Sequence, residues 1–175
     1  NSVGVADYRN YTPYIVGPAG PSLTSDDPAE YSSIQAAVDQ AILDGSNENN
    51  RFYIWIKPGT YTENLVLDGS TIIAGQSSFN CILQGTISIP NATGPTFLQE
   101  IRDLTLLQVP GTRVIDAPQA KQGRIQLLNF NVIVTDITTP AINVVIPDPG
   151  DYFFFVGIQG SVRTPNAISP TPDVF

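Results

Sequence analysis

The feature of this chain that most constrains its fold is an internal repeat with a period of about 26 residues. The segments IRDLTLLQ (101–108) and LLNFNVIV (127–134) align with one another, so that Leu104 lies over Phe130 and Leu106 over Val132. Val156 and Ile158 continue the pattern at the same offset. Self-similarity at a fixed period indicates a stack of similar units, in which each unit packs against its neighbours.

A second element repeats independently. The pairs Val114-Ile115, Ala141-Ile142 and Ala167-Ile168 recur at nearly the same interval, each after a turn. A unit of this length with two or three strands and no helix predicts an all-β fold, a right-handed parallel β-helix of four to five coils. Successive coils of such a solenoid stack about 4.8 Å apart through parallel ladders.

Residues 31–45 carry the only helical pattern, with apolar side chains at i, i+3, i+4, i+7 and i+8. Ser32 followed by Gln35 predicts a capping box, and Gly45 predicts a left-handed stop. The open bottom of a first coil exposes apolar surface and strand edges, which must be covered. We therefore expect the helix to cap the solenoid.

Short strands are predicted after the helix at 52–57, 62–67 and 71–75, separated by Pro- and Gly-containing turns. The stretch 57–61, KPGTY, predicts the corner between two faces of the first coil. The candidates for the buried bore are Ile54, Ile56, Leu65, Leu67, Leu104, Leu106, Ile115, Phe130, Val132, Ile142, Val156, Ile158 and Ile168.

The chain is interpreted as one domain, with an irregular segment at 1–30, the capping helix at 31–45 and the β-helix at 52–175. Its longest apolar stretch, YFFFVGI, has seven residues and is too short to cross a bilayer, so no membrane insertion is predicted. No signal peptide is predicted from the first residues of this sequence. A start at Asn1 without any Met indicates a fragment or a processed form of a longer chain.

The composition excludes several classes of function. A net charge of −8 repels phosphate backbones and argues against nucleic-acid binding. One Cys and no His exclude an internal disulfide, a Cys-rich zinc site and the usual triad or histidine-metal chemistries. The sequence predicts no cofactor and no metal site, and any catalysis would depend on carboxylates, Arg, Lys or Tyr.

The stretch YSSIQAAVDQA, an apolar strand, IKPGTYTENLVL and TIIAG together resemble the pectin lyase-like superfamily, above all the start of pectin methylesterases. The resemblance covers about residues 31–75 and implies the cap and first coils of a parallel β-helix. Gly59, Tyr61 and Glu63 match the early G-x-Y-x-E pattern of that family. The segments that carry the two catalytic Asp, the Arg and the Gln of the esterases are not found in this chain.

The resemblance also includes polysaccharide lyases and hydrolases of this fold. The lyases use several Asp residues that bind calcium together with an Arg base, and the hydrolases use clustered Asp residues. The candidates here are Asp103 and Asp116 with Arg102 and Arg113. These acids do not recur in the repeats: Asp103 aligns with Asn129 and then Phe155, and Asp116 aligns with Asn143. Such Asp and Asn residues are typical of turns and of hydrogen-bonded ladders.

The run DYFFFVGIQ places aromatic side chains on both faces of one strand, because alternate residues point in opposite directions. Tyr152, Phe153 and Phe155 are the candidate binding residues. Loops that cover them, a subunit interface and a platform for sugars all stay open as explanations.

The favoured function is a non-catalytic structural or attachment module of a viral or phage particle, such as a tailspike, or of a cell-surface protein. Its expected partners are further copies of the chain, with a trimer favoured, and a surface glycan. The expected location is extracellular or on the virion surface. The alternative is a carbohydrate-active enzyme, a pectin esterase, polysaccharide lyase or glycoside hydrolase, that acts on acidic polysaccharide.

Overall fold

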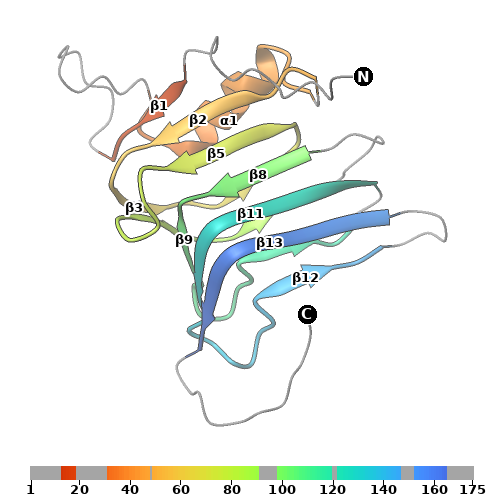
Figure 1. The fold of residues 1–175 in the computed structure, drawn as a ribbon. Helices are drawn as coiled ribbons and strands as arrows, with labels where there is room; N and C mark the ends of the chain where they lie inside the picture. The colour runs from red at the N-terminus through yellow and green to blue at the C-terminus, as the bar shows by residue number, and fades with distance from the viewer. Residues whose placement is uncertain are drawn as a thin grey trace.

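The computed structural model describes residues 13–18, 31–47, 49–90, 98–119, 122–146 and 152–164, which form a parallel β-solenoid (Figure 1). Strand β1 (Tyr14–Val16) and helix α1 (Ile34–Leu43) come first. The coils then comprise β2 (Phe52–Ile56), β3 (Gly59–Thr62) and β4 (Leu65–Val66); β5 (Thr71–Gly75), β6 (Cys81–Gln84) and β7 (Ile87–Ser88); β8 (Leu98–Arg102), β9 (Thr105–Leu107) and β10 (Ile115–Ala117); β11 (Gln122–Ile133) and β12 (Ile142–Val144); and β13 (Tyr152–Arg163).

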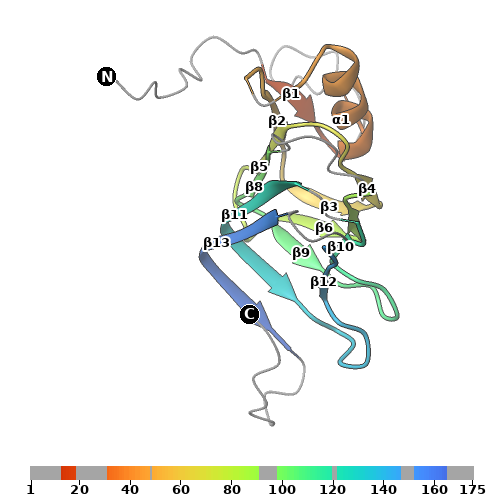
Figure 2. The same cartoon turned by 90° about the vertical axis from the view of Figure 1, so that its right-hand side faces the viewer.

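The strands build two parallel sheets that wrap around one core. The first is a nine-stranded sheet in the order β1-β2-β5-β8-β11-β9-β6-β3, with β13 paired to β11, and the second has the order β12-β10-β7-β4. Because β11 runs along two walls, it joins the strands β2, β5 and β8 to the strands β3, β6 and β9 (Figures 1 and 2). The predicted parallel solenoid is confirmed. It makes about three complete turns, fewer than the predicted four to five coils. After β10 only β11 and β12 follow as a further set of strands, and β13 is the last described strand.

The predicted repeat is confirmed in the middle of the chain. Thr105 pairs with Asn131, which lies 26 residues further along, and the side chains of the two residues are hydrogen-bonded. Ile101 pairs with Leu127 at the same offset. The second element also recurs as predicted, because Ile115 of β10 pairs with Ile142 of β12.

The predicted register of the last strand is wrong. Val156 and Ile158 pair with Gln126 and Leu128 of β11. This offset is 30 residues, and the Ser161 hydroxyl donates to Asn131 Oδ1 across the same interval. A Cβ at Gly160 would overlap the ring of Phe130, whereas a Cβ at Gly157 would make an ordinary van der Waals contact with it. Gly160 therefore sets the register of β13 over β11.

At one corner of the solenoid, successive coils each place one residue in the left-handed backbone conformation, with positive φ. Asp103 follows β8 with φ 55°, and Asn129 and Gln159 take φ 46° and 53° within β11 and β13. Asp and Asn tolerate this conformation better than most residues. Asn129 Nδ2 donates to Asp103 Oδ1 at 2.5 Å. The third residue of this column is Gln159 and not the predicted Phe155, because β13 is shifted.

The first coil has a tighter corner than the sequence predicts. Gly59–Thr62 pairs with Cys81–Gln84 as strand β3, so the corner is confined to Lys57 and Pro58 and does not extend to Tyr61. The predicted strand at 62–67 is confirmed only in part, since Thr62 ends β3 and Leu65–Val66 forms β4. Strand β3 ends just before Glu63, because the carboxylate of Glu63 hydrogen-bonds to the first turn of the helix.

The core is a column of aliphatic side chains from successive coils. Of the predicted bore residues, eight are buried: Ile54, Ile56, Leu65, Leu67, Leu104, Leu106, Ile115 and Val132. Phe130 is partly buried against this core. The prediction is wrong for Ile142, which is 37% exposed because no described strand stacks on it, and for Ile158, which is 44% exposed. Ile158 pairs with Leu128, which itself pairs with the partly exposed Arg102, so the side chain of Ile158 points away from the core. Val156 is only partly buried, and Ile168 lies outside the described residues.

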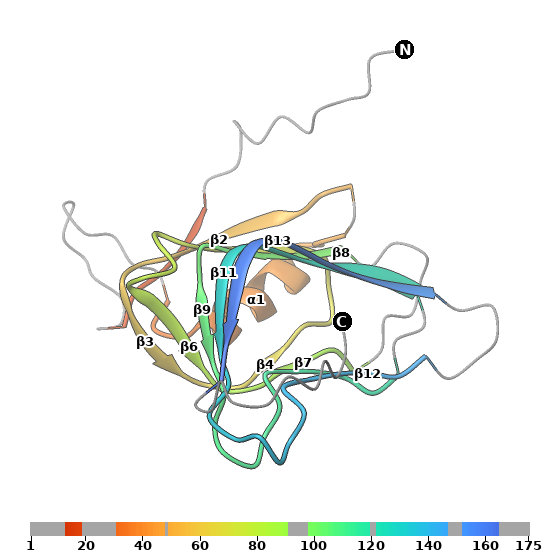
Figure 3. The same cartoon turned by 60° about the horizontal axis from the view of Figure 1, so that its bottom comes forward.

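Helix α1 lies across the first coil and closes it (Figure 3). Its residues Ile34, Ala37 and Val38 are fully buried in the core that includes Ile54 and Leu65, and Ala41 is fully buried as well. The left-handed stop is confirmed: Gly45 has φ 87°, Gly45 N–H donates to Ile42 O, and Ser46 N–H donates to Ala41 O. No helix in the described part of the chain is long and apolar enough to cross a membrane.

The predicted capping box of Ser32 and Gln35 is wrong, because the N-cap is Ser33 and the helix begins at Ile34. The carboxylate of Glu63 accepts hydrogen bonds from Ile34 N–H at 2.8 Å, Gln35 N–H at 3.0 Å and the Ser33 hydroxyl at 2.7 Å. A carboxylate is favoured there by the unpaired N–H groups and by the helix dipole. Glu63, at the end of β3, thus ties the helix to the first coil.

The side chain of Gln35 covers the edge of β4. Its amide oxygen accepts from Val66 N–H at 2.7 Å, and its amide nitrogen donates to Val66 O at 3.2 Å. This pair of bonds imitates the contacts of a neighbouring strand, so the side chain satisfies an edge that would otherwise be open.

We expect Glu63→Ala to lower the free energy of unfolding by roughly 1.5 to 3 kcal/mol, since the two helix N–H groups lose a charged acceptor. Glu63→Gln keeps an acceptor oxygen and is the matched control, with a smaller expected loss. Urea unfolding followed by circular dichroism measures both. Equal midpoints for Glu63→Ala and the wild type would contradict the role of Glu63.

A buried glutamine joins the turns that precede β10 and β12. Gln108 is 1% exposed, accepts from Thr135 N–H and Asp136 N–H, and donates to Thr112 O and Thr139 O. The adjacent Asp136 carboxylate accepts from the hydroxyl and N–H of Thr138 and from Gly111 N–H. The hydrogen bonds from Thr138, followed by that from Gly111, hold the pKa of Asp136 well below its usual range.

The low pKa of Asp136 predicts a loss of stability in acid. A depressed carboxyl pKa in the folded state contributes stability above the unfolded pKa of about 4, and that contribution is lost as the pH falls. Asp136→Asn removes this titration. We therefore expect the free energy of unfolding to fall less in Asp136→Asn than in the wild type between about pH 4 and about pH 2, measured by urea unfolding at each pH. Parallel curves would rule out the contribution.

Candidate functional site

The structure does not bring the two sequence-predicted acids together. Asp103 lies at the corner after β8 in the first sheet, and Asp116 lies in β10 of the second sheet. Arg113 Nη1 contacts Asp116 Oδ1 at 2.8 Å, and Asn143 Nδ2 donates to the same oxygen at 2.7 Å. Asp116 and Asn143 are register partners, as predicted, so this group is a ladder between neighbouring strands.

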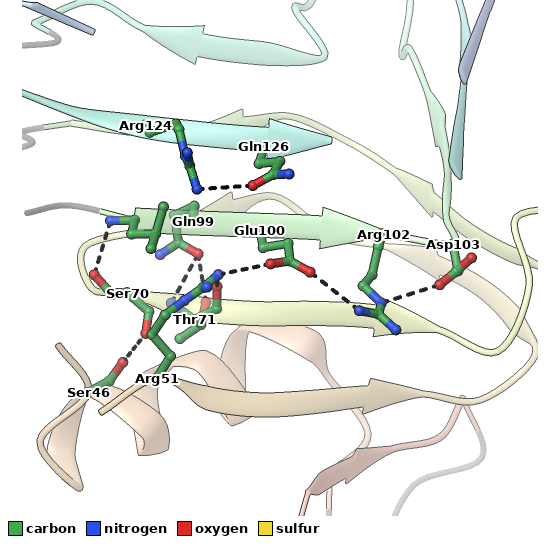
Figure 4. A network of polar contacts seen from close by, with 11 residues as sticks. Ser46, Arg51, Ser70, Thr71, Gln99, Glu100, Arg102, Asp103, Arg124 and Gln126 are labelled. Atoms are coloured by element: carbon green, nitrogen blue, oxygen red, sulfur yellow. Dashed lines mark hydrogen bonds and ion pairs between the residues drawn. The ribbon is translucent and has the colours of Figure 1, made fainter. Parts of the chain in front are cut away.

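A different cluster forms on the outer face of β2, β5 and β8, which we call the outer-face cluster: Arg51, Tyr53, Trp55, Glu100, Arg102 and Asp103. Figure 4 shows its charged members in a row. Glu100 contacts Arg51 at 3.4 Å through one carboxylate oxygen and Arg102 at 3.4 Å through the other. Arg102 Nε also contacts Asp103 Oδ2 at 3.4 Å. The row therefore alternates in sign from Arg51 to Asp103.

The aromatic members come from β2. Tyr53 and Trp55 alternate with the buried Ile54 and Ile56, so they point away from the core. Their ring centroids lie 6.2 Å apart with planes inclined by only 18°. The Arg102 guanidinium lies 6.0 Å from the centroid of the Tyr53 ring, within the range of a cation–π contact.

Side chains from β2 and β8 meet over the intervening strand β5. Ile72 and Ala74 of β5 are register partners of Glu100 and Arg102, and they are 2% and 0% exposed although they lie on the outer side of the sheet. Arg102 itself keeps 41% of its side chain exposed. The cluster is thus a flat platform with a covered apolar base and a polar, partly exposed top.

The electrostatics of the cluster hold Tyr53 and Arg102 in their ordinary charge states. Burial raises the pKa of the Tyr53 hydroxyl, and the opposing effect of Arg102 is smaller. Burial lowers the pKa of Arg102, but Tyr53, Glu100 and Asp103 outweigh it, and the pKa is raised. Tyr53 therefore stays protonated and Arg102 stays charged near neutral pH. Both groups serve recognition better than proton transfer.

The described residues contain no group of three or more His, Cys, Asp or Glu that could hold a metal ion. Arg51 Nε is buried without a hydrogen-bond partner in the described part of the structure. The three ion pairs of the cluster are longer than the roughly 2.7–2.9 Å of a strong charge-assisted hydrogen bond. Arg102 and Asp103, whose side chains are 41% and 27% exposed, therefore retain capacity for further hydrogen bonds.

Sequence reasoning found Arg102 and Asp103 but missed Glu100, Arg51, Tyr53 and Trp55. The alternation in FYIWIK is a usable signal for the two aromatics, because it points them to the outer face. Nothing local identifies Glu100 or Arg51, since they meet only when β2, β5 and β8 lie in register.

The candidate binding residues Tyr152, Phe153 and Phe155 lie in β13, where their backbone pairs with Gln122–Ile125 of β11. Their side chains lie outside the described part of the structure. Their role in binding stays a prediction.

The last coils form a second candidate surface. Ile142, Val145, Ile146, Ile158 and Val162 are between 37% and 52% exposed. Beside them, a depression is lined by Ile133, Val134, Thr135, Arg163 and Thr164. Among the described residues, β13 pairs with β11 and with no strand on its other side. We call this surface the open end.

Comparison with known proteins gives no match to a family model, a curated protein or a solved structure. The resemblance to the pectin lyase-like superfamily therefore stays a prediction.

We expect Glu100→Gln to lower the free energy of unfolding by roughly 3 kcal/mol, because it leaves the largely buried Arg51 without its counter-charge. Arg113→Gln is the control: it breaks a more exposed pair and should cost about 0 to 1 kcal/mol. Urea unfolding of both variants measures the difference. Similar costs would show that the pairs of the outer-face cluster behave as surface ion pairs.

Proposed function

We propose that this chain is a non-catalytic structural or attachment module that joins other chains through its open end. The observation that carries the proposal is the difference between the two ends of the solenoid. At the first coil, α1, Gln35 and Glu63 cover the core and the strand edge. At the last coil, inward-facing side chains such as Val162 are half exposed.

Two features of this end support the proposal: exposed apolar side chains and an unpaired strand edge. Contiguous exposed apolar surface is typical of association sites. An unpaired strand edge is also a template for pairing with another chain, which native proteins usually block. Ile142, Val145 and Ile146 lie on β12 and directly after it, and Val162 lies on β13 over the buried Val132, so the apolar groups and the edge belong to the same end.

The setting that fits the proposal is a viral or phage particle or a cell-surface protein, with an extracellular or virion-surface location. A homotrimer is the favoured assembly. This part of the proposal rests on the resemblance of short parallel β-helices to spike and fibre proteins.

We expect the purified chain to form an oligomer in size-exclusion chromatography with light scattering. Replacing Ile146 and Val162 by Lys together should shift it to monomer, because two ammonium groups would have to be buried unpaired. Phe79→Lys is the control, since Phe79 is 89% exposed in the turn between β5 and β6. A monomeric wild type at every concentration tested would end the proposal.

A second candidate, a carbohydrate-active enzyme, is favoured by one observation. Glu100, Asp103 and Arg102 bring two carboxylates and an Arg together on a parallel sheet, which is the arrangement expected for an enzyme on acidic polysaccharide. Assays on pectin and alginate, with and without calcium, distinguish this candidate. Turnover that is abolished by both Glu100→Gln and Asp103→Asn would favour the enzyme over the module.

A further inference from the structure

We propose that the outer-face cluster is a binding platform for a neutral glycan, with Tyr53 and Trp55 as its stacking surface, Arg102 and Asp103 as its hydrogen-bonding groups, and the buried Glu100 as the group that positions Arg102. This inference rests on the attachment part of the proposed function. It names a ligand class and a surface that is separate from the open end.

The aromatic geometry supports stacking. A pyranose ring presents a face of C–H groups that packs against an aromatic ring, and its hydroxyls need donors and acceptors at the rim. Tyr53 and Trp55 offer two nearly parallel rings from one strand, with planes 18° apart. Because β2 is hydrogen-bonded on both sides, to β1 and β5, the spacing of the rings is fixed before a ligand binds.

Planar polar side chains surround the rings. Arg102 is 41% exposed and lies above the Tyr53 ring, while Glu100 and Asp103 contact its guanidinium. The polar surface continues onto β11, where Arg124 donates to Gln126 at 3.2 Å. Adjacent hydroxyls of a sugar are bound by such planar groups, which can donate or accept two hydrogen bonds at once.

The charges favour a neutral ligand over an acidic one. Arg51, Arg102 and Arg124 carry three positive charges, and Glu100 and Asp103 carry two negative charges, each within 3.4 Å of an arginine. Only one positive charge remains uncompensated, and the chain as a whole carries −8. A polyanion would therefore gain little locally and would be repelled by the rest of the chain.

The most direct experiment uses Trp55, which is the single Trp of the chain. Neutral gluco-, manno- and galacto-oligosaccharides are titrated into the wild-type protein, with oligogalacturonate as the acidic probe. We expect a saturable change of Trp55 fluorescence with at least one neutral oligosaccharide and none with the acidic one. No response to any neutral probe, or a response to the acidic probe alone, overturns the proposal.

Variants test the assignment of the surface by isothermal titration calorimetry. Tyr53→Leu and Trp55→Leu keep an apolar cover over Ile72 and Ala74 and should weaken binding at least ten-fold. Arg102→Lys keeps the charge but removes the planar guanidinium, so it tests whether the two-pronged hydrogen bonding of Arg102 contributes to binding. Phe79→Leu, which removes an exposed aromatic elsewhere, should leave binding unchanged. Equal loss in Phe79→Leu, or no loss in the β2 variants, contradicts the platform.

Light scattering on the same variants separates the two proposals. Tyr53→Leu and Trp55→Leu should keep the oligomeric state of the wild type, because the platform lies outside the open end. If they change the oligomeric state and no saccharide binds, this face is a protein interface and the glycan proposal fails. If saccharide binds to a monomeric wild type, the assembly through the open end fails and the platform stands.

Discussion

Parallel stacking of one coil on the next is the constraint on which the rest of this structure depends. Each coil buries aliphatic side chains such as Ile73 and Ile101 against the coils before and after it, and its backbone groups pair with both neighbours. The first coil has no earlier coil to use. Helix α1 fills that place with an apolar face, and Glu63 and Gln35 supply the polar contacts that a strand would have made.

The sequence predicts the solenoid because positions that stack on one another in successive coils carry similar side chains. Ile115 and Ile142 pair in space, and so do Asp116 and Asn143 beside them, at a separation of 27 residues. A pattern in the chain is therefore enough to reveal this contact. The register of β13 cannot be read in this way. It depends on the ring of Phe130, and a packing fit of this kind has no periodic signature.

Only part of the outer-face cluster can be predicted from the sequence, for a similar reason. Arg102 and Asp103 are neighbours in the chain and can be recognised together. Glu100 meets Arg51 across two strand boundaries, at a separation of 49 residues, and only the stacking of β2, β5 and β8 in register creates that contact. Charged groups on the outside of a solenoid need not repeat, so no column of like residues marks them.

The unequal ends of the solenoid also give the molecule a gradient of local stability. In a stacked array each unit is held mainly by its two neighbours. The coil beneath α1 has a partner on both sides, whereas β13 has only β11 among the described strands. Among the described strands, opening therefore starts at β13 and travels toward the helix, coil by coil, and the amide hydrogens of β13 exchange fastest.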